Sequence, residues 1–292
     1  MPYSKICAKI VSMNINLKNK RIDLHMHSVY SDGTYTPKEL VLEAKKREVY
    51  AISLTDHDTH EGIEEASREA SEAGIIFIPG VELSSKFNIG PFSSTDLHIL
   101  AYGFDVKNSR LNEKLAFFIQ KRFERNMEII EAFKTYGIDI DYNELQGMSG
   151  KNIITKVHFV KYLLEKNIVK EREEGFQRFF VGDVITNIDK ITLEPKECIE
   201  LIKSSGGKAV LAHPFRYKMN TGELVDTLAK LDIDGIEAIY PTHTKEEEEF
   251  LKEKAKKNGL FITGGSDFHG DNRKSIHIGY VDAFYPLLEA LL

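Results

Sequence analysis

Three short segments of this chain concentrate histidines and carboxylates: residues 23–27 (DLHMH), 55–58 (TDHD) and 266–269 (SDFH). Side chains on a β-strand alternate between two faces, so His25 and His27 would point the same way. The same holds for Asp267 and His269. Imidazoles and carboxylates are ligands of divalent transition metals, and burying them together is costly unless a metal ion or hydrogen bonds satisfy them. The residue types and their spacing therefore predict the metal site of an enzyme.

The composition is that of an ordinary globular protein. Of 292 residues, 42% are hydrophobic and 29% are charged, which allows one large domain or a domain with an insertion. The net charge of −6 argues against long duplex nucleic acid as a partner. A small phosphorylated substrate is compatible with it, because bound metal ions reverse the local field. Two distant cysteines, Cys7 and Cys198, suggest neither a disulfide framework nor a zinc knuckle.

The chain contains no run that approaches the ~20 apolar residues of a membrane span. Its first twenty residues hold several lysines, no long apolar run and no small-residue cleavage site, so we do not expect a secretory signal. We therefore expect a cytoplasmic protein without a membrane partner.

Short apolar runs alternate with amphipathic stretches, which predicts βα units and a parallel sheet. We expect strands at residues 21–25, 51–55, 75–79, 97–102, 209–212, 235–240, 261–264 and 278–281. We expect helices at residues 37–49, 62–73, 195–205, 223–231 and 245–258. Pro37 and Pro195 suit first turns, and Gly74 and Gly259 suit helix ends. The histidines and carboxylates follow the strands, at the end where a closed βα barrel carries its active site.

Residues 105–194 break this alternation. Helical patterns cover 112–136 and 154–166, and an irregular segment continues to Thr192. We expect a helical insertion over 105–194 that leaves and rejoins a barrel domain formed by 20–104 and 195–292, after an N-terminal extension of residues 1–19. The insertion either covers the barrel or forms a lid that selects substrate.

Five segments of the chain resemble the motifs of one known family and occur in the same order. They are residues 23–33, 55–58, 80–82 (GVE), 212–214 (AHP) and 265–269 (GSDFH). They resemble the motifs of the PHP (polymerase and histidinol phosphatase) phosphoesterases, and the match runs from about residue 21 to the end. The inserted block and residues 176–182 and 195–214 look most like the branch with nucleoside 3′,5′-bisphosphate phosphatases and a 5′-to-3′ exoribonuclease. The resemblance implies an α/β fold, a distorted seven-stranded βα (TIM-like) barrel with a helical insertion.

The resemblance also implies two to three divalent metal ions. The first would be held by His25, His27, Glu82 and Asp267, the second by Glu82, His98 and His213, and the third by Asp32, His57 and His269. Imidazoles and carboxylates suit zinc, manganese or iron, and a carboxylate such as Glu82 can bridge two ions. His98 also fits simple strand alternation. Asp23 and Asp56 are expected to orient the histidines.

The substrate-binding candidates lie outside this set. His243 matches a family position near the phosphate, and with Asp267 it is a candidate catalytic residue. Arg122 and Arg125 share one face of a predicted helix with Asn126. The related branch usually has Arg-Pro-His where this chain has Lys156-Val157-His158, so Lys156 would offer a point charge in place of a forked guanidinium. Solvent-facing helix charge is the alternative for the residues of the insertion.

No activated cysteine or Gly-x-Ser-x-Gly elbow is evident, so water is the expected nucleophile. Metal binding lowers the pKa of water from 15.7 to roughly 7. We expect a metal-dependent phosphoesterase, a phosphatase or phosphodiesterase acting on a small nucleotide or a short oligoribonucleotide end. The alternatives are a histidinol-phosphate phosphatase, a non-catalytic PHP module that binds metal or a partner, and, more remotely, an amidohydrolase.

Overall fold

The computed structural model describes residues 19–87, 92, 96–149, 153–181, 185, 188, 191–217 and 219–291. The expected N-terminal extension, with Cys7, lies outside the described residues apart from Asn19. The second cysteine, Cys198, is buried and free.

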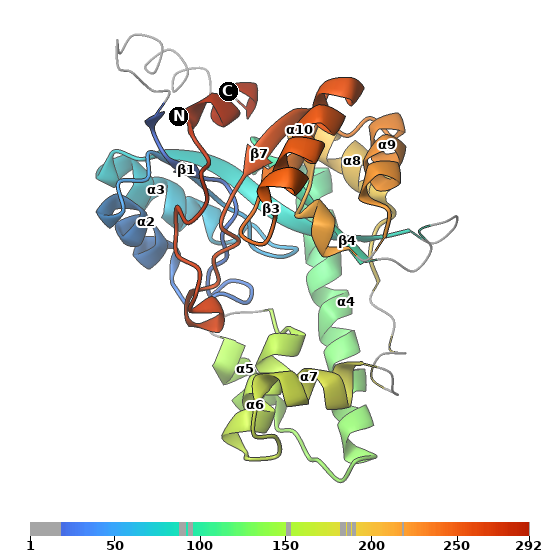
Figure 1. Cartoon of the computed structure of the whole chain (residues 1–292). Coiled ribbons are helices and arrows are strands. Elements are labelled where there is room, and N and C mark those ends of the chain that lie inside the picture. The colour runs from blue at the N-terminus through green and yellow to red at the C-terminus, as the bar shows by residue number, and fades with distance from the viewer. Residues whose placement is uncertain are drawn as a thin grey trace.

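Seven strands form one sheet in chain order (Figure 1). They are β1 (Ile22–Asp23), β2 (Ala51–Leu54), β3 (Ile76–Lys86), β4 (Asp96–Tyr102), β5 (Lys208–Leu211), β6 (Gly235–Ile239) and β7 (Phe261–Gly264). The amide of Leu24 donates to the carbonyl of Gly264 at 3.2 Å, and Met26 forms a parallel bridge with Phe268. These bonds join the first strand to the last, so the sheet is a nearly closed barrel, as the resemblance predicts.

Gly265 makes this closure sterically feasible. A Cβ at position 265 would collide with the Cβ and the backbone nitrogen of His25. Only glycine therefore lets the segment after β7 approach the segment after β1 so closely.

Two sequence-based expectations about the sheet are wrong. The sheet is not all parallel, because β4 runs antiparallel to both β3 and β5. Only residues 87–95 connect β3 to β4, and a parallel crossover needs a dozen or more residues. Residues 278–281 are a turn and not a strand. Gly279 has φ +69° there, and Ile278 is buried by packing without pairing to a strand.

Five helices cover the outside of the barrel: α2 (Pro37–Lys46), α3 (Ile63–Ala73), α8 (Pro195–Ser204), α9 (Thr221–Lys230) and α10 (Lys245–Asn258). Their start and stop signals act as predicted. Pro37 and Pro195 open their helices, and Gly74 and Gly259 end theirs in the left-handed conformation, at φ 75° and 68°. The barrel core is a single apolar cluster that the strands and these helices share.

A second apolar cluster lies in the helical block below the barrel (Figure 1). This block contains α4 (Ser109–Lys134), α5 (Tyr142–Ser149), α6 (Lys156–Glu165) and α7 (Arg172–Phe180). Leu111 and Phe118 at the start of α4 pack in the barrel core, whereas Ile129 and Phe133 near its end pack in the second cluster. The long helix α4 therefore belongs to both cores.

Helix α7 corrects the expectation of an irregular segment before Thr192. Its apolar residues Phe176, Phe179 and Phe180 have the i, i+3, i+4 spacing of one helix face. With nine residues it offers only two turns of that pattern, which are easily missed in a sequence. Among the described residues, no helix is both long and apolar enough to cross a membrane.

Candidate metal centre

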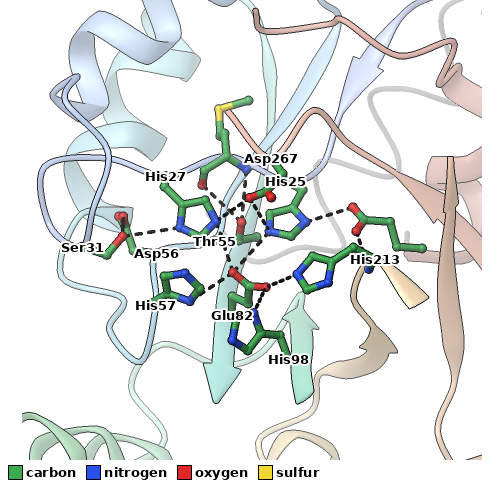
Figure 2. A network of polar contacts seen from close by, with 12 residues as sticks. His25, His27, Ser31, Thr55, Asp56, His57, Glu82, His98, His213 and Asp267 are labelled. Carbon is green, nitrogen blue, oxygen red and sulfur yellow. Dashed lines mark hydrogen bonds and ion pairs between the residues drawn. The ribbon is translucent and has the colours of Figure 1, made fainter. Parts of the chain in front are cut away.

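The buried carboxylate of Glu82 lies at the centre of a ring of histidines, of which His57 and His98 are partly exposed (Figure 2). Its Oε2 atom lies 3.1–3.3 Å from ring nitrogens of three of them, His25, His27 and His57. Its Oε1 atom lies 2.8–3.1 Å from ring nitrogens of two others, His98 and His213. The two oxygens thus divide the imidazoles into two groups, which is the arrangement a bridging carboxylate requires.

The barrel brings these side chains to one end. His25 and His27 follow β1, His57 follows β2, and His213 follows β5. His98 lies near the start of β4 and not at its end. Because β4 is antiparallel to its neighbours, its start lies at the same end of the barrel as the C-terminal ends of the others. The reversed strand therefore completes the ring.

Two further carboxylates extend the cluster. Asp267 Oδ1 lies 3.2 Å from His27 Nε2 and 3.4 Å from His25 Nε2. Asp32 Oδ1 lies 3.2 Å from His269 Nε2. In three groups all ligand atoms lie within 4.8 Å of one another: His25, His27, Glu82 and Asp267; His27, Asp32, His57 and His269; and His57, Glu82 and His98. All the expected ligands meet here. His27, His57 and Glu82 are each shared between two groups, and His213 reaches the cluster through Glu82.

Several buried polar atoms in this cluster have no hydrogen-bond partner among the described residues. They include His25 Nε2, His27 Nε2, His57 Nδ1, His98 Nδ1 and Glu82 Oε2. An unsatisfied buried polar atom typically costs ~1–3 kcal/mol, so a cluster of such atoms indicates side chains suited to hold a cation. The donor set of imidazole nitrogens and carboxylate oxygens fits divalent transition metals.

The charge states differ across the cluster. Burial would lower the pKa of His27, but the carboxylates of Asp267 and Glu82 raise it to about 10, so this ring must lose a proton to ligate a metal. Burial lowers the pKa of His57 to about 3 and that of His213 to about 4, so both rings are neutral near pH 7. Burial alone would raise the pKa of Glu82, but the imidazoles of His57 and His98 hold it well below its usual range. Neutral imidazoles and an ionised carboxylate are the forms that ligate a metal.

Two predicted ligands sit on strained backbone. His213 has φ +29° and Asp267 has φ +51°, and neither is glycine. Such conformations cost on the order of 1–3 kcal/mol each and persist where the surrounding structure imposes them. The strain lies at the ends of β5 and β7, where the chain turns both side chains into the cluster.

Glu237 on β6 is a site residue that the sequence analysis missed. Its side chain is fully buried, Oε1 accepts a hydrogen bond from His25 Nδ1 at 2.9 Å, and Oε2 accepts one from the amide of His213 at 2.8 Å. The first bond leaves the Nε2 lone pair of His25 facing the cluster. A glutamate inside the apolar run of β6 was the available signal.

Asp23 and Asp56, which we expected to orient the histidines, do not hydrogen-bond to the histidine rings directly. Asp23 accepts hydrogen bonds from the amides of His25, Ser266 and Gly279 at 2.7–3.3 Å, which ties the segments after β1 and β7 together. Asp56 accepts a hydrogen bond of 2.5 Å from the Ser31 hydroxyl, which lies 3.4 Å from His27 Nδ1 (Figure 2). Asp56 therefore reaches a ring only through a serine.

A cavity of about 550 Å³ opens above the cluster. Its wall contains three arginines that the sequence analysis missed: Arg172 of the insertion, Arg216 in the short helix η2 (Pro214–Arg216) and Arg273 in η3 (Gly270–Arg273). Arg216 and Arg273 contact Asp267 Oδ2, at 3.3 Å and 2.6 Å, and the Tyr240 hydroxyl donates to the same oxygen at 2.7 Å. Arg216 and Arg273 each follow a motif histidine by three or four residues, which was the available signal for these two.

Comparisons with known proteins agree with this geometry. The PHP domain matches residues 23–205 of the chain. The chain belongs to the PHP family. A Haemophilus influenzae protein named 5′-3′ exoribonuclease is 32% identical to this PHP protein over 278 residues, which cover 92% of this chain and 98% of the relative. A Chromobacterium violaceum protein named 3′,5′-nucleoside bisphosphate phosphatase is 28% identical, covering 91% and 93%.

The fold of this PHP protein is also that of solved relatives. A Bifidobacterium adolescentis structure described as a metal-dependent phosphoesterase superimposes with a TM-score of 0.82 at 25% identity, covering 94% of this chain and 96% of that one. The predicted family and barrel are confirmed. Family, fold and clustered ligands together identify a metal-dependent phosphoesterase.

The substrate-binding candidates of the PHP protein do not line the cavity. His243 lies behind it: its ring packs against Phe215 and Tyr240, and its Nδ1 lies 2.9 Å from the Ala238 carbonyl. Thr242 lines the cavity in its place.

The candidates in the insertion are engaged elsewhere. The guanidinium of Arg122 pairs with Asp58, and Arg125 donates to the Ile188 carbonyl at 3.1 Å. His158 Nδ1 accepts a hydrogen bond from the amide of Thr155 at 2.9 Å. Lys156 Nζ lies 5.8 Å from the ring centre of Phe180. The insertion reaches the cavity instead through Val157, Arg172 and Phe176.

Proposed function

We propose that this PHP protein hydrolyses a phosphoester of a small nucleotide, such as a nucleoside 3′,5′-bisphosphate, or the end of a short oligoribonucleotide. The observation that carries the proposal is the position of Arg216 and Arg273 in the cavity above the ring of imidazoles around Glu82. Imidazoles and carboxylates hold cations, and guanidinium groups recognise phosphate. The relatives named exoribonuclease and bisphosphate phosphatase support this substrate class.

The proposal includes two to three divalent ions, either manganese, zinc or iron. Glu82 would bridge the first two, with His25, His27 and Asp267 on one side and His98 and His213 on the other. Asp32, His57 and His269 would hold the third. When bound, such ions lower the pKa of water to roughly 7 and neutralise phosphoryl charge.

Asp267 links the ions to the substrate in this proposal. Its Oδ1 atom faces the imidazoles while its Oδ2 atom accepts from Tyr240 and both arginines. A phosphoryl group in the cavity would meet Arg216 and Arg273 there, and each guanidinium can donate two parallel hydrogen bonds to phosphate oxygens. Tyr240 would keep Asp267 oriented when the arginines turn to the substrate. His243, which packs against Tyr240, is then a positioning residue.

The insertion over residues 105–194 acts in the proposal as a substrate domain, because three of its side chains line the cavity. The proposed setting is the cytoplasm, where small nucleotides and short RNA fragments are available, and no long duplex is expected as a partner.

The test is release of phosphate or nucleotide, with Mn²⁺ present, from adenosine 3′,5′-bisphosphate, mononucleotides, histidinol phosphate and a short RNA. Preference for the bisphosphate or the RNA is expected, with activity lost in His25→Ala and kept in the matched control His277→Ala. Turnover of histidinol phosphate alone would favour that alternative. No hydrolysis of any substrate in the panel, with metal bound, would favour a non-catalytic module.

A further inference from the structure

We propose that Arg172 is a specificity-determining residue that binds a second anionic group of the substrate, separate from the phosphoester held at the metal centre. The inference rests on the proposed function and deepens it. Arg172 opens α7, in the insertion, and lines the cavity together with Phe176 of the same helix. The metal centre lies on the barrel side of that cavity. The cavity therefore has cationic groups on two walls built from separate parts of the chain.

The three arginines of the cavity differ in their partners. Arg216 and Arg273 are both paired with Asp267 Oδ2. Arg172 forms no ion pair among the residues that the structure describes, since Asp32 acts on it only from beyond ion-pair distance, and its side chain is exposed. A guanidinium carries five N–H donors, and with the described residues Arg172 makes one hydrogen bond, to the Asn272 carbonyl at 2.6 Å. An accessible cation with unused donors beside the cavity is suited to an anionic ligand.

The guanidinium of Arg172 is also held in place before any ligand arrives. Its central carbon lies 5.6 Å from the ring centre of Phe176, a cation–π contact, and its bond to Asn272 fixes it from the barrel side. A guanidinium group that is already oriented loses less conformational entropy when it binds phosphate than a lysine side chain does. Because Asn272 lies in η3 beside Arg273, this bond also places Arg172 near the arginines of the barrel.

This geometry selects a class of substrate. A simple monoester needs only the metal centre with Arg216 and Arg273. A nucleoside bisphosphate, or an oligonucleotide with its next phosphodiester, carries a second anion that can reach the other wall. The volume of about 550 Å³ lies within the ~300–1,000 Å³ typical of small-molecule sites. Arg172 would therefore distinguish nucleotides with two phosphates from those with one.

The experiment measures kcat/KM of Arg172→Ala, Arg172→Lys and Arg172→Gln with adenosine 3′,5′-bisphosphate and with p-nitrophenyl phosphate. A charge-assisted hydrogen bond corresponds to a fall of about tenfold to hundredfold. We expect that loss for the bisphosphate in the Ala variant, against less than about twofold for the aryl phosphate. Arg172→Lys should recover part of the lost kcat/KM for the bisphosphate, because lysine keeps the positive charge. Gln keeps a donor for the Asn272 carbonyl but no charge, and should resemble Ala.

The matched control is Arg178→Ala. Arg178 lies on the same helix and stacks over Phe179 at 4.9 Å, but it does not line the cavity, and its removal should leave both substrates unchanged. Calorimetry of the bisphosphate with wild-type and Arg172→Ala protein supplies a readout independent of turnover, with a weaker Kd expected for the variant.

Three outcomes would overturn the inference: equal losses for both substrates in Arg172→Ala, no loss for either, or a Gln variant that behaves like the wild type. The last would assign Arg172 to closure of the insertion instead. Failure of the proposed function looks different, since the wild-type protein would then show no preference for the bisphosphate over the aryl phosphate.

Discussion

The substitution Glu237→Gln tests whether this residue controls the ligand state of His25. The carboxylate accepts two hydrogen bonds, from His25 Nδ1 at 2.9 Å and from the His213 amide at 2.8 Å. A glutamine side chain has one acceptor oxygen and one NH₂ group. It can accept from His25 Nδ1 or from the His213 amide, and the other of these two donors would then face the NH₂ group. Turning the amide's NH₂ towards His25 would force the proton of that ring onto Nε2, the atom that faces the metal centre.

The expected loss follows from these contacts. A buried hydrogen bond to a charged group contributes ~1.5–3 kcal/mol, and removing a partner that orients a metal ligand typically weakens metal binding ~10–100-fold. These two estimates agree, because a hundredfold change corresponds to about 2.7 kcal/mol. We therefore expect Glu237→Gln to bind Mn²⁺ about 10–100-fold more weakly and to recover activity at raised Mn²⁺ concentration.

The assay is Mn²⁺ titration by calorimetry or against a competing chelator, with kcat/KM measured over a range of Mn²⁺ concentrations. Glu248→Gln is the matched control, since Glu248 is also buried but pairs with Lys245 on α10. Wild-type affinity in Glu237→Gln, or an equal loss in the control, would refute the reasoning.

Three further results are expected. Arg122→Ala should lower the free energy of unfolding by about 3 kcal/mol, because it removes one partner of a buried ion pair with Asp58; a urea titration that shows less than about 1 kcal/mol would contradict this. Burial lowers the pKa of His158 to about 4, so between pH 6.5 and 4 the unfolded chain binds more protons. His158 therefore supports up to about 3 kcal/mol of stability at neutral pH that is lost as the pH falls through this window, and His158→Asn should flatten the pH dependence of unfolding there. Mn²⁺ at a hundredfold excess over its Kd should stabilise the protein by about 2.7 kcal/mol, and chelation or His27→Ala should abolish the corresponding rise in Tm.

Sequence reasoning works best where one local signal determines the outcome. Helix α10 has the expected bounds because a capping threonine and a left-handed Gly259 mark its ends. The family resemblance and the barrel are confirmed, because each motif is a short local pattern of histidines and carboxylates that can be read from the sequence. The direction of β4 was recoverable too, from the short connection that precedes it, but apolar runs alone do not encode strand direction.

Other site residues depend on packing between distant segments. The apolar run of β6 shows that Glu237 is unusual, but not that the folded barrel brings its side chain to His25, with β7 between the two strands. Arg216 and Arg273 meet at Asp267 only once η2 and η3 fold over the barrel. In contrast, Arg122 has the charge expected of a phosphate ligand, yet it is used to fix the insertion to the barrel. Charge predicts that a partner exists but not which one.

Helix α4 has a consequence for how the molecule unfolds. Its 26 residues span ~39 Å, and the two ends are buried in different cores. Loss of the helical block would fray α4 towards the barrel, and loss of the barrel would release the start of the helix that supports the block. We therefore expect the two cores to melt in one cooperative transition, with hydrogen exchange slowest along α4 and not confined to the barrel strands.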